Sequence, residues 1–224
     1  HYLEHMLFKG TNKLGALDWD KEKVLLDNIR DLYEEHKLES DEVKKKLIYG
    51  KIDSVSQLAA KLVSPNEYDK LMQNIGGSNT NAYTSSERTV YINEIPSNEI
   101  ERWLTIEKER FSELVLRLFH TELEAVYEEY NMRMKDSDYS KSYKKLFELL
   151  YLKHPLGTQT TIGEAEHLQN PSWLNIEDYF KKYYVPNNMC IAMSGDFNMD
   201  STFKMISDHF SSFEMQDIPN LVLP

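Results

Sequence analysis

The sequence has 224 residues, of which 41% are hydrophobic and 28% charged, an ordinary composition for one large globular domain with a substantial core. Its formal net charge of −11 argues against nucleic-acid binding, since phosphate contacts need clustered Lys and Arg. The single cysteine, Cys190, excludes an intrachain disulfide framework and fits a periplasmic or a cytoplasmic location equally well. No apolar run reaches the length of a membrane span.

The first third of the chain is predicted to be mainly helical. Its first residues have the pattern of a helix that Gly10 can end. Residues 18–63 carry two apolar stripes at helical spacing, separated near Leu38–Asp41, which predicts a two-helix hairpin. A solvated helical insertion is the favoured interpretation of this hairpin, ahead of a substrate flap or a docking surface. Pro65 begins a further short helix that ends at Gly76.

A β-hairpin is predicted next. Residues 79–84 and 89–93 are rich in β-branched and aromatic side chains and flank a polar turn at 85–88. Asn98 and Glu101 then have the spacing of a capping box and predict the start of a long helix.

The same capping spacing recurs at Thr121 and Glu124, which predicts a break near His120 and a new helix from Glu122. We therefore expect the segment around Glu122 to be helical.

The remaining pattern is mixed. It predicts helices over 143–152, 174–184 and 200–211, a loop over 154–163, and a buried strand over 189–195. There are no repeats and no linkers, so residues 1–224 are expected to form a single α+β domain.

The pentapeptide His1-Tyr2-Leu3-Glu4-His5 carries the clearest chemical signal. On a helix, His1 and His5 lie one turn apart on one face, and Glu4 falls on the same side. Two imidazoles that can bind one divalent ion, with a carboxylate beside them, are the groups that a zinc hydrolase needs. The order H-x-x-E-H is the inverse of the commoner H-E-x-x-H motif.

A catalytic zinc site needs a third protein ligand. Glu122, Val126 and Glu129 have the i, i+4, i+7 spacing of one helix face, whereas Glu128 points about 100° away from Glu129. Facing the first helix, Glu129 would reach the metal and Glu122 would orient a histidine.

Other candidate ligands are weaker. Cys190 is a soft zinc ligand, but its apolar surroundings are more typical of a core position. The remaining histidines considered as ligands lack a partner at ligand spacing: His120, His154, His167 and His209.

Five segments occur in order over nearly the whole chain: HYLEHMLFKGT, GGSNTNAYTS, ELEAVYEE, HPLG and YYVPNNMCIAMSGD. Together they resemble the pitrilysin/insulinase family of zinc peptidases, which includes mitochondrial processing peptidase. The resemblance implies the family's α+β domain, a largely antiparallel sheet backed by helices, and a zinc-dependent endopeptidase acting on peptides or unfolded segments.

The resemblance also implies a role for each matching residue. His1, His5 and Glu129 would be the ligands of one Zn²⁺ ion, Glu4 the general base that activates the zinc-bound water, and Glu122 a supporting glutamate.

The resemblance further implies a substrate track, since Asn81, Ala82 and Thr84 match the family's segment that contacts substrate backbone.

Two departures from the family pattern stand out. The spacing from His5 to Glu129 is longer by roughly fifty residues, for which the 18–63 insertion accounts. The strand that precedes the signature and the later domains are absent from the sequence. The chain is thus expected to be an N-terminally truncated catalytic part of a longer enzyme, or one subunit of a heteromer, with further domains or a homologous subunit as partner.

Three other functions remain open. A non-catalytic partner subunit of the same family would bind peptides without cleaving them, although such subunits typically lose the ligand set and the base. A peptide-binding scaffold with structural zinc would need a fourth ligand. A lyase of small thioethers would need Cys190 as its third ligand.

Overall fold

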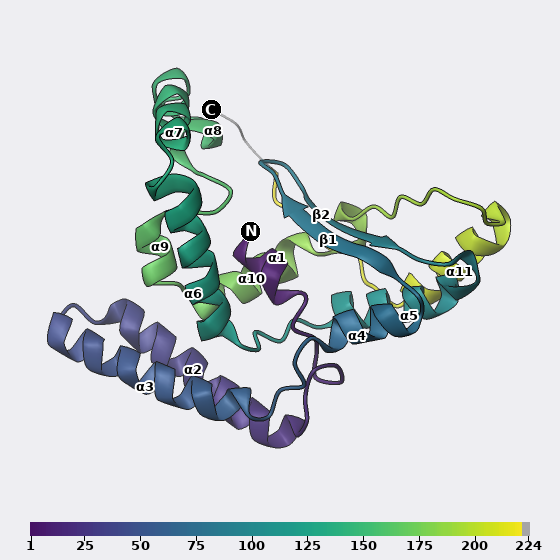
Figure 1. Cartoon of the computed structure of the whole chain (residues 1–224), viewed down its shortest axis with the longest axis horizontal. Coiled ribbons are helices and arrows are strands. Elements are labelled where there is room, and N and C mark those ends of the chain that lie inside the picture. Colours follow the sequence, from purple (N-terminus) through teal and green to yellow (C-terminus); the bar gives the residue numbers. More distant parts are fainter. Residues whose placement is uncertain (221–224) are drawn as a thin grey trace.

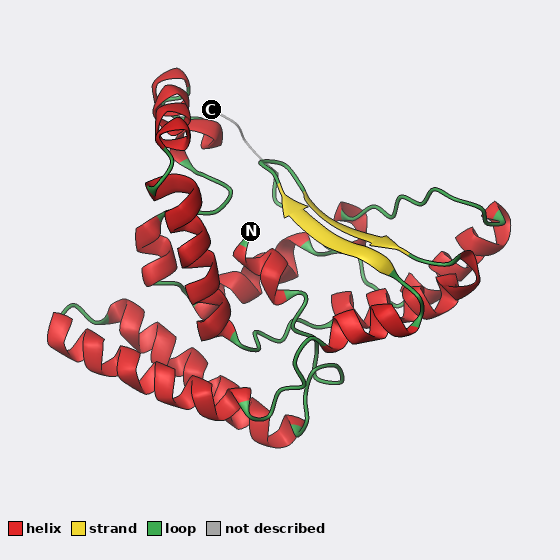
Figure 2. Ribbon diagram, in the orientation of Figure 1, coloured by secondary structure: helices red, strands yellow, loops and turns green. Residues whose placement is uncertain are grey.

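The short helix α1 (Tyr2–Met6) lies at the centre of the molecule, between helix α6 (Phe119–Tyr130) and the hairpin of strands β1 (Ser78–Thr84) and β2 (Thr89–Glu94) (Figure 1). The computed structural model describes residues 1–220. Helices dominate, and the two antiparallel strands are the only ones in this part of the chain (Figure 2). The α+β class is therefore confirmed, with a sheet much smaller than expected.

Helices α2 (Trp19–Leu38) and α3 (Glu42–Ala60) form the predicted hairpin at the lower left of Figure 1. Asp18 and Asp41 cap them by accepting hydrogen bonds from backbone N–H groups of the first turn. The inner face of the hairpin reaches the main core, where Tyr33 and Ile52 are fully buried. One stripe of each helix is therefore part of the core, and the opposite faces, with Leu38 and Leu47, are exposed to solvent.

A buried arginine joins this hairpin to the loop that follows α1. Arg117 donates hydrogen bonds to the backbone carbonyls of Lys9 (2.8 Å), Leu14 (2.7 Å) and Thr11 (3.0 Å). Gly15 (φ +88°) needs to be a glycine, because a Cβ there would lie 2.7 Å from Nη1 of Arg117. The loop after α1 is thus wrapped around one guanidinium group.

The start of α6 differs from the prediction. Helix α5 (Ile100–Ser112) ends early, and Leu118 with φ 57° precedes Phe119, the first residue of α6. Thr121 therefore lies inside the helix and cannot cap it. The side chain of Asn98 does not cap α5 either, since it donates to Glu99 (2.9 Å). Capping-box spacing also occurs within helices, so tertiary packing decided where these helices begin.

The expected buried strand at 189–195 is also absent. These residues form no strand and are mostly exposed, and no strand in residues 1–220 pairs with them. Cys190 is exposed too, contrary to its expected core position. An apolar segment without a neighbouring strand leaves its backbone groups to the solvent. The prediction was wrong because strand pairing is not a local property.

The other elements surround this framework. The predicted helices near 65–76, 143–152, 174–184 and 200–211 are present, and a short helix occupies part of the expected 154–163 loop. Their bounds are α4 Glu67–Asn74, α7 Asp138–Leu150, α8 Pro155–Thr158, α9 Ala165–Gln169, α10 Trp173–Tyr183 and α11 Met199–Phe210, with short 3-10 turns at Ser97–Glu99 and Pro186–Asn188 and a π-helix at Asn131–Lys135.

The main core packs around Phe119, whose ring contacts those of Tyr2, Tyr33 and Trp173. Because Phe119 is the first residue of α6, this contact anchors α6 beside α1. No helix within residues 1–220 has the length and apolarity needed to cross a membrane.

Candidate metal centre

Three side chains from α1 and α6 converge on one point. One nitrogen each of His1 and His5 and one carboxylate oxygen of Glu129 all lie within 4.8 Å of one another. Nε2 of His1 is 2.9 Å, and Nε2 of His5 3.8 Å, from Oε2 of Glu129. The structure thus brings Glu129 to the two histidines that the sequence singled out, which precede it by 128 and 124 residues.

The other ring nitrogens of the two histidines face different carboxylates. Nδ1 of His5 lies 3.4 Å from Oε2 of Glu122, and Nδ1 of His1 lies 3.4 Å from Oε2 of Glu4. At His5, a proton on Nδ1 donated to Glu122 would leave the lone pair of Nε2 directed at the convergence point. At His1, Nε2 is likewise the nitrogen nearest Glu129. Both rings therefore present the same nitrogen to a metal.

Two cations that the sequence analysis missed flank the acidic residues of α6. Nζ of Lys9 lies 2.6 Å from Oε1 of Glu122, and Nη2 of Arg133 lies 2.8 Å from Oε1 of Glu129. Arg133 follows Glu129 by four residues on the continuing helix, a spacing that could have signalled the pair. Lys9 lies beyond α1, so only the fold could reveal its contact.

These contacts keep both glutamates ionised. Burial alone would raise the pKa of Glu122, but hydrogen bonds from His5 and Lys9 outweigh it and leave that pKa lowered. Burial likewise acts to raise the pKa of Glu129, and the hydrogen bond from His1 and the charge of Arg133 lower it overall. A carboxylate held in its charged form is the state that binds a cation.

Glu4 occupies a buried position between α1 and the β-hairpin. Its side chain accepts a hydrogen bond from the hydroxyl of Thr84, the last residue of β1. The contact fixes one carboxylate oxygen beside the histidines. Thr84, which the resemblance associated with substrate, therefore also contacts the expected base.

Asn81 and Ala82 lie further back on β1, paired with Ile92 and Tyr91 of β2. Asn81 is exposed, and its side chain accepts a hydrogen bond from the backbone N–H of Ala82 (2.9 Å). Within residues 1–220, β1 pairs with β2 alone, so its other edge is open. An open edge has backbone groups that can pair with an extended peptide.

The competing histidines have structural contacts. His120 is buried and lies 2.8 Å from the hydroxyl of Tyr33, and Nδ1 of His154 accepts from Leu156 N–H at the start of α8. His209 lies 2.8 Å from the carbonyl of Met205. His167 is exposed, and the convergence on Glu129 is the only His/Cys/Asp/Glu cluster with metal-ligand spacing among residues 1–220.

The donor set fits zinc. Two imidazoles and one carboxylate are one of the ligand sets of catalytic zinc, which leaves a fourth position open. Calcium and magnesium favour oxygen ligands, so two nitrogen donors select against them. An open site of this kind is one that zinc hydrolases use.

Comparison with known proteins shows which proteins this chain resembles. Residues 175–224 match the family model described as "Peptidase M16 inactive domain". The zinc protease PqqE of Helicobacter pylori is 29% identical over 161 residues, covering 71% of this chain and 36% of the relative. The beta subunit of the mitochondrial-processing peptidase of Saccharomyces cerevisiae is 25% identical over 154 residues, covering 66% and 32%.

Solved structures agree. A protease from Helicobacter pylori matches with a TM-score of 0.66 and 28% identity, covering 70% of this chain and 39% of that one. The first half of the periplasmic protease PqqL from Escherichia coli matches 100% of this chain and 39% of its own length, with a TM-score of 0.69 and 17% identity. The resemblance to the pitrilysin/insulinase type of zinc peptidases, the peptidase M16 family, is thereby confirmed. It spans about a third of the length of the curated relatives it matches.

Proposed function

We propose that this chain provides the catalytic site of a zinc-dependent endopeptidase that hydrolyses peptides or unfolded segments. The observation that carries the proposal is the convergence of His1, His5 and Glu129 beside the buried carboxylate of Glu4. The family model's description as an inactive domain applies to residues 175–224, which contain none of these four residues.

In this proposal His1, His5 and Glu129 hold one zinc ion, and Glu122 orients His5. Bound zinc supplies Lewis acidity, which lowers the pKa of water and polarises a carbonyl group. Glu4 takes a proton from the attacking water as the oxygen bonds to the scissile carbonyl carbon. It delivers that proton to the amide nitrogen as the C–N bond breaks, which regenerates the carboxylate and releases an amine and an acid.

The open edge of β1 supports a role in holding the substrate. A peptide added as a strand along Asn81–Thr84 would make main-chain hydrogen bonds, which are independent of sequence. Because Thr84 contacts Glu4, such a strand would pass beside the base. This arrangement favours extended or unfolded segments over folded proteins.

The partners we propose are a peptide substrate and further domains or a subunit of the same family. The chain covers only 36% of the H. pylori zinc protease, and one match is a subunit of a processing peptidase. Further domains of one polypeptide, or a homologous partner subunit, would complete the enclosure of the substrate.

Substitution of the base tests the proposal. In the full-length protein, the Glu4→Gln variant should bind zinc at the wild-type stoichiometry. It should no longer cleave an unstructured peptide. A chelator should abolish wild-type cleavage, and added zinc should restore it. Full activity of Glu4→Gln would remove Glu4 from the mechanism.

A second candidate function is a non-catalytic peptide-binding subunit, which the description of the matched family model favours. The same assay decides between the two. A wild-type protein that binds peptide and zinc but leaves the peptide intact, with any partner subunit present, would support this second function and exclude the first.

A further inference from the structure

The side chain of Lys9 joins the loop that follows α1 to helix α6. Its Nζ lies 2.6 Å from Oε1 of Glu122, and the two side chains are only 22% and 14% exposed. The other carboxylate oxygen of Glu122, Oε2, lies 3.4 Å from Nδ1 of His5. One carboxylate is therefore held at both oxygens, by a cation on one side and by a candidate metal ligand on the other.

The backbone of Lys9 is fixed as well. Its carbonyl accepts a hydrogen bond from Nη1 of the buried Arg117 (2.8 Å), and its N–H donates to the carbonyl of Met6 (3.0 Å). Gly10, the next residue, has φ +95°, and a Cβ there would collide with the carbonyl oxygen of Leu14. The tight turn that starts at Gly10 and the bond from Arg117 thus anchor Lys9 just after α1.

The ion pair limits the conformations of Glu122. A glutamate side chain on a helix has several rotamers, and fixing Oε1 selects one in which Oε2 faces His5. A ligand that is oriented before the metal binds loses less entropy on binding. Residues that contact a metal-bound histidine typically change metal affinity by about 10–100-fold. Lys9 acts one contact further away, so its effect should be smaller and of the same sign.

The charge of Lys9 by itself acts in the opposite direction. An ammonium group near a divalent cation repels it, so loss of the charge alone should raise zinc affinity. Loss of the positioning contact should lower zinc affinity, because Glu122 would no longer be held against His5. The direction of the change therefore distinguishes a positioning residue from a nearby charge.

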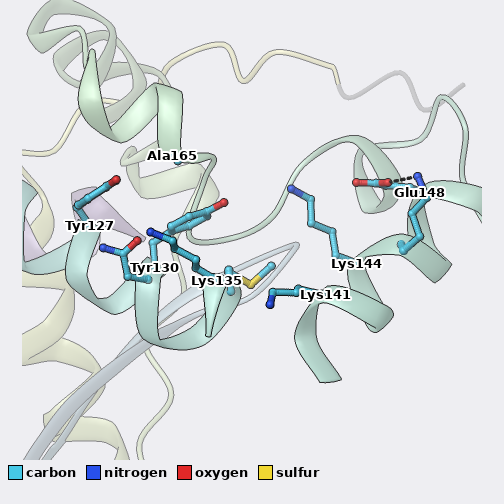
Figure 3. A pocket seen from close by; sticks show the side chains of 10 residues that line it. Tyr127, Tyr130, Lys135, Lys141, Lys144, Glu148 and Ala165 are labelled. Atoms are coloured by element: carbon cyan, nitrogen blue, oxygen red, sulfur yellow. Dashed lines mark hydrogen bonds and ion pairs between the residues drawn. The ribbon is translucent and has the colours of Figure 1, made fainter. Parts of the chain in front are cut away.

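Lys144 of α7 provides a comparison. It lines a cavity beside α6 and extends toward Tyr130 (Figure 3). It forms an ion pair with Glu164 at 2.6 Å, in which both side chains are 30% exposed. The distance equals that of the Lys9–Glu122 pair and the exposure is similar. Within residues 1–220, neither Lys144 nor Glu164 has a hydrogen bond or ion pair with a residue of the candidate metal centre.

We propose that Lys9 is a positioning residue of the metal centre, which holds Glu122 against His5 and thereby raises the affinity of the site for zinc. The inference rests on the proposed function for the identity of the metal. It adds a residue that neither contacts the metal nor takes part in the reaction. It also gives the loop after α1 a role, since the buried Arg117 places Lys9.

Zinc affinity of the full-length protein, measured by competition with a chromophoric chelator, tests this. Lys9→Met should weaken zinc binding by about three- to tenfold, less than the loss of a residue that contacts a ligand directly. Lys9→Arg, which keeps a cation at this position, should recover most of the affinity. Lys144→Met is the matched control, because it removes a similar ion pair, and it should leave zinc affinity unchanged.

Chemical denaturation of the metal-free variants separates positioning from general stability. Both ion pairs are partly exposed, so Lys9→Met and Lys144→Met should lower the denaturation midpoint by similar, small amounts. A lysine with a structural role alone would lower the midpoint without changing zinc affinity.

A double substitution identifies the route of the effect. In a Glu122→Ala background, Lys9→Met should cause no further loss of zinc affinity, because Lys9 acts through that carboxylate. An unchanged or increased zinc affinity of Lys9→Met in the otherwise wild-type protein would overturn the inference. So would a loss that persists in the Glu122→Ala background.

Zinc binding and peptide cleavage together separate this inference from the proposed function. A protein whose zinc affinity depends on Lys9 but which never cleaves a peptide would sustain the role of Lys9 and overturn the peptidase. Peptide cleavage by a protein whose zinc affinity is the same with and without Lys9 would do the reverse. A wild-type protein that binds no zinc would overturn both.

Discussion

Arg117 and Glu22 form a fully buried ion pair in which two guanidinium nitrogens contact the two carboxylate oxygens at 2.5 and 2.9 Å. The pair joins helix α2 to the residue that comes two before α6, and the same guanidinium holds the loop after α1. The inserted hairpin and both helices of the candidate metal centre therefore meet at one side chain.

Removing Arg117 should be strongly destabilising. Arg117→Met would leave a buried carboxylate and three backbone carbonyls without their donor, so we expect a loss of about 3–5 kcal/mol in the free energy of unfolding. Glu22→Gln should cost less, since the guanidinium keeps its carbonyl partners. Chemical denaturation measures both. Arg102→Met is the control, because it removes an ion pair with Glu99 whose arginine is mostly exposed, and it should lower the free energy of unfolding by at most about 1 kcal/mol. An equal loss of stability for the Arg102 and Arg117 variants would contradict the role of burial.

The hairpin should contribute to stability through its inner face only. Ile52→Ala opens a cavity at a fully buried position and should cost about 2–5 kcal/mol. Leu47→Ala on the same helix removes a side chain that is 64% exposed and should change stability by no more than about 0.5 kcal/mol. Thermal unfolding of the two variants compares them directly, and similar melting temperatures would mean that the hairpin does not share the core.

Glu129 should be needed for zinc binding. We expect Glu129→Ala to weaken zinc affinity by about two orders of magnitude or more. Substitution of a residue that only orients a metal ligand already lowers metal affinity by about 10–100-fold. Metal analysis after dialysis against a weak chelator gives the stoichiometry. Glu128→Ala is the matched control, because Glu128 is exposed on another face of α6; loss of zinc from Glu128→Ala alone would place the third ligand there.

Thr84 should tune the rate rather than metal binding. Its hydroxyl donates to Glu4, and loss of a hydrogen bond to a charged group costs about 1.5–3 kcal/mol. Thr84→Val should therefore lower kcat by roughly tenfold or more with zinc content unchanged, and Thr84→Ser should retain most of it. Thr89→Val is the control, because the Thr89 hydroxyl lies near that of Thr84 (3.4 Å). Steady-state kinetics with one peptide would show an equal effect of both valine variants if the contact with Glu4 were unimportant.

Stability should fall on mild acidification because of His36. Burial lowers the pKa of this imidazole, although its contact with Asn170 (3.0 Å) opposes the shift. Below the unfolded value of about 6.5 the unfolded chain binds more protons than the native one, so the free energy of unfolding decreases as the pH falls from there toward the lower native pKa. His36→Gln should reduce this decrease in denaturation curves between pH 7.5 and 5, and His167→Gln at an exposed position should not.

The geometry of the candidate metal centre was largely predictable because its parts are local. The four-residue spacing of His1 and His5, and the seven-residue spacing of Glu122 and Glu129, each define one face of a helix. Only the fold places those faces against each other, with Nε2 of His1 2.9 Å from Oε2 of Glu129.

Predictions of boundaries and pairing failed where they depended on distant residues. Thr121 has capping spacing, yet Leu118 and the buried Arg117 set the start of α6. The segment 189–195 is apolar enough for a strand, but a strand forms only where another strand supplies hydrogen-bond partners.

The sequence by itself determined which side chains make up the candidate metal centre: two imidazoles, a nearby carboxylate and an acidic helix face are set by spacing along helices, which short-range geometry dictates. Tertiary structure alone decided that Thr84 contacts Glu4 and that Lys9 pairs with Glu122. These contacts join residues from different elements, and the packing of the core around Phe119 and Arg117 brings the elements together.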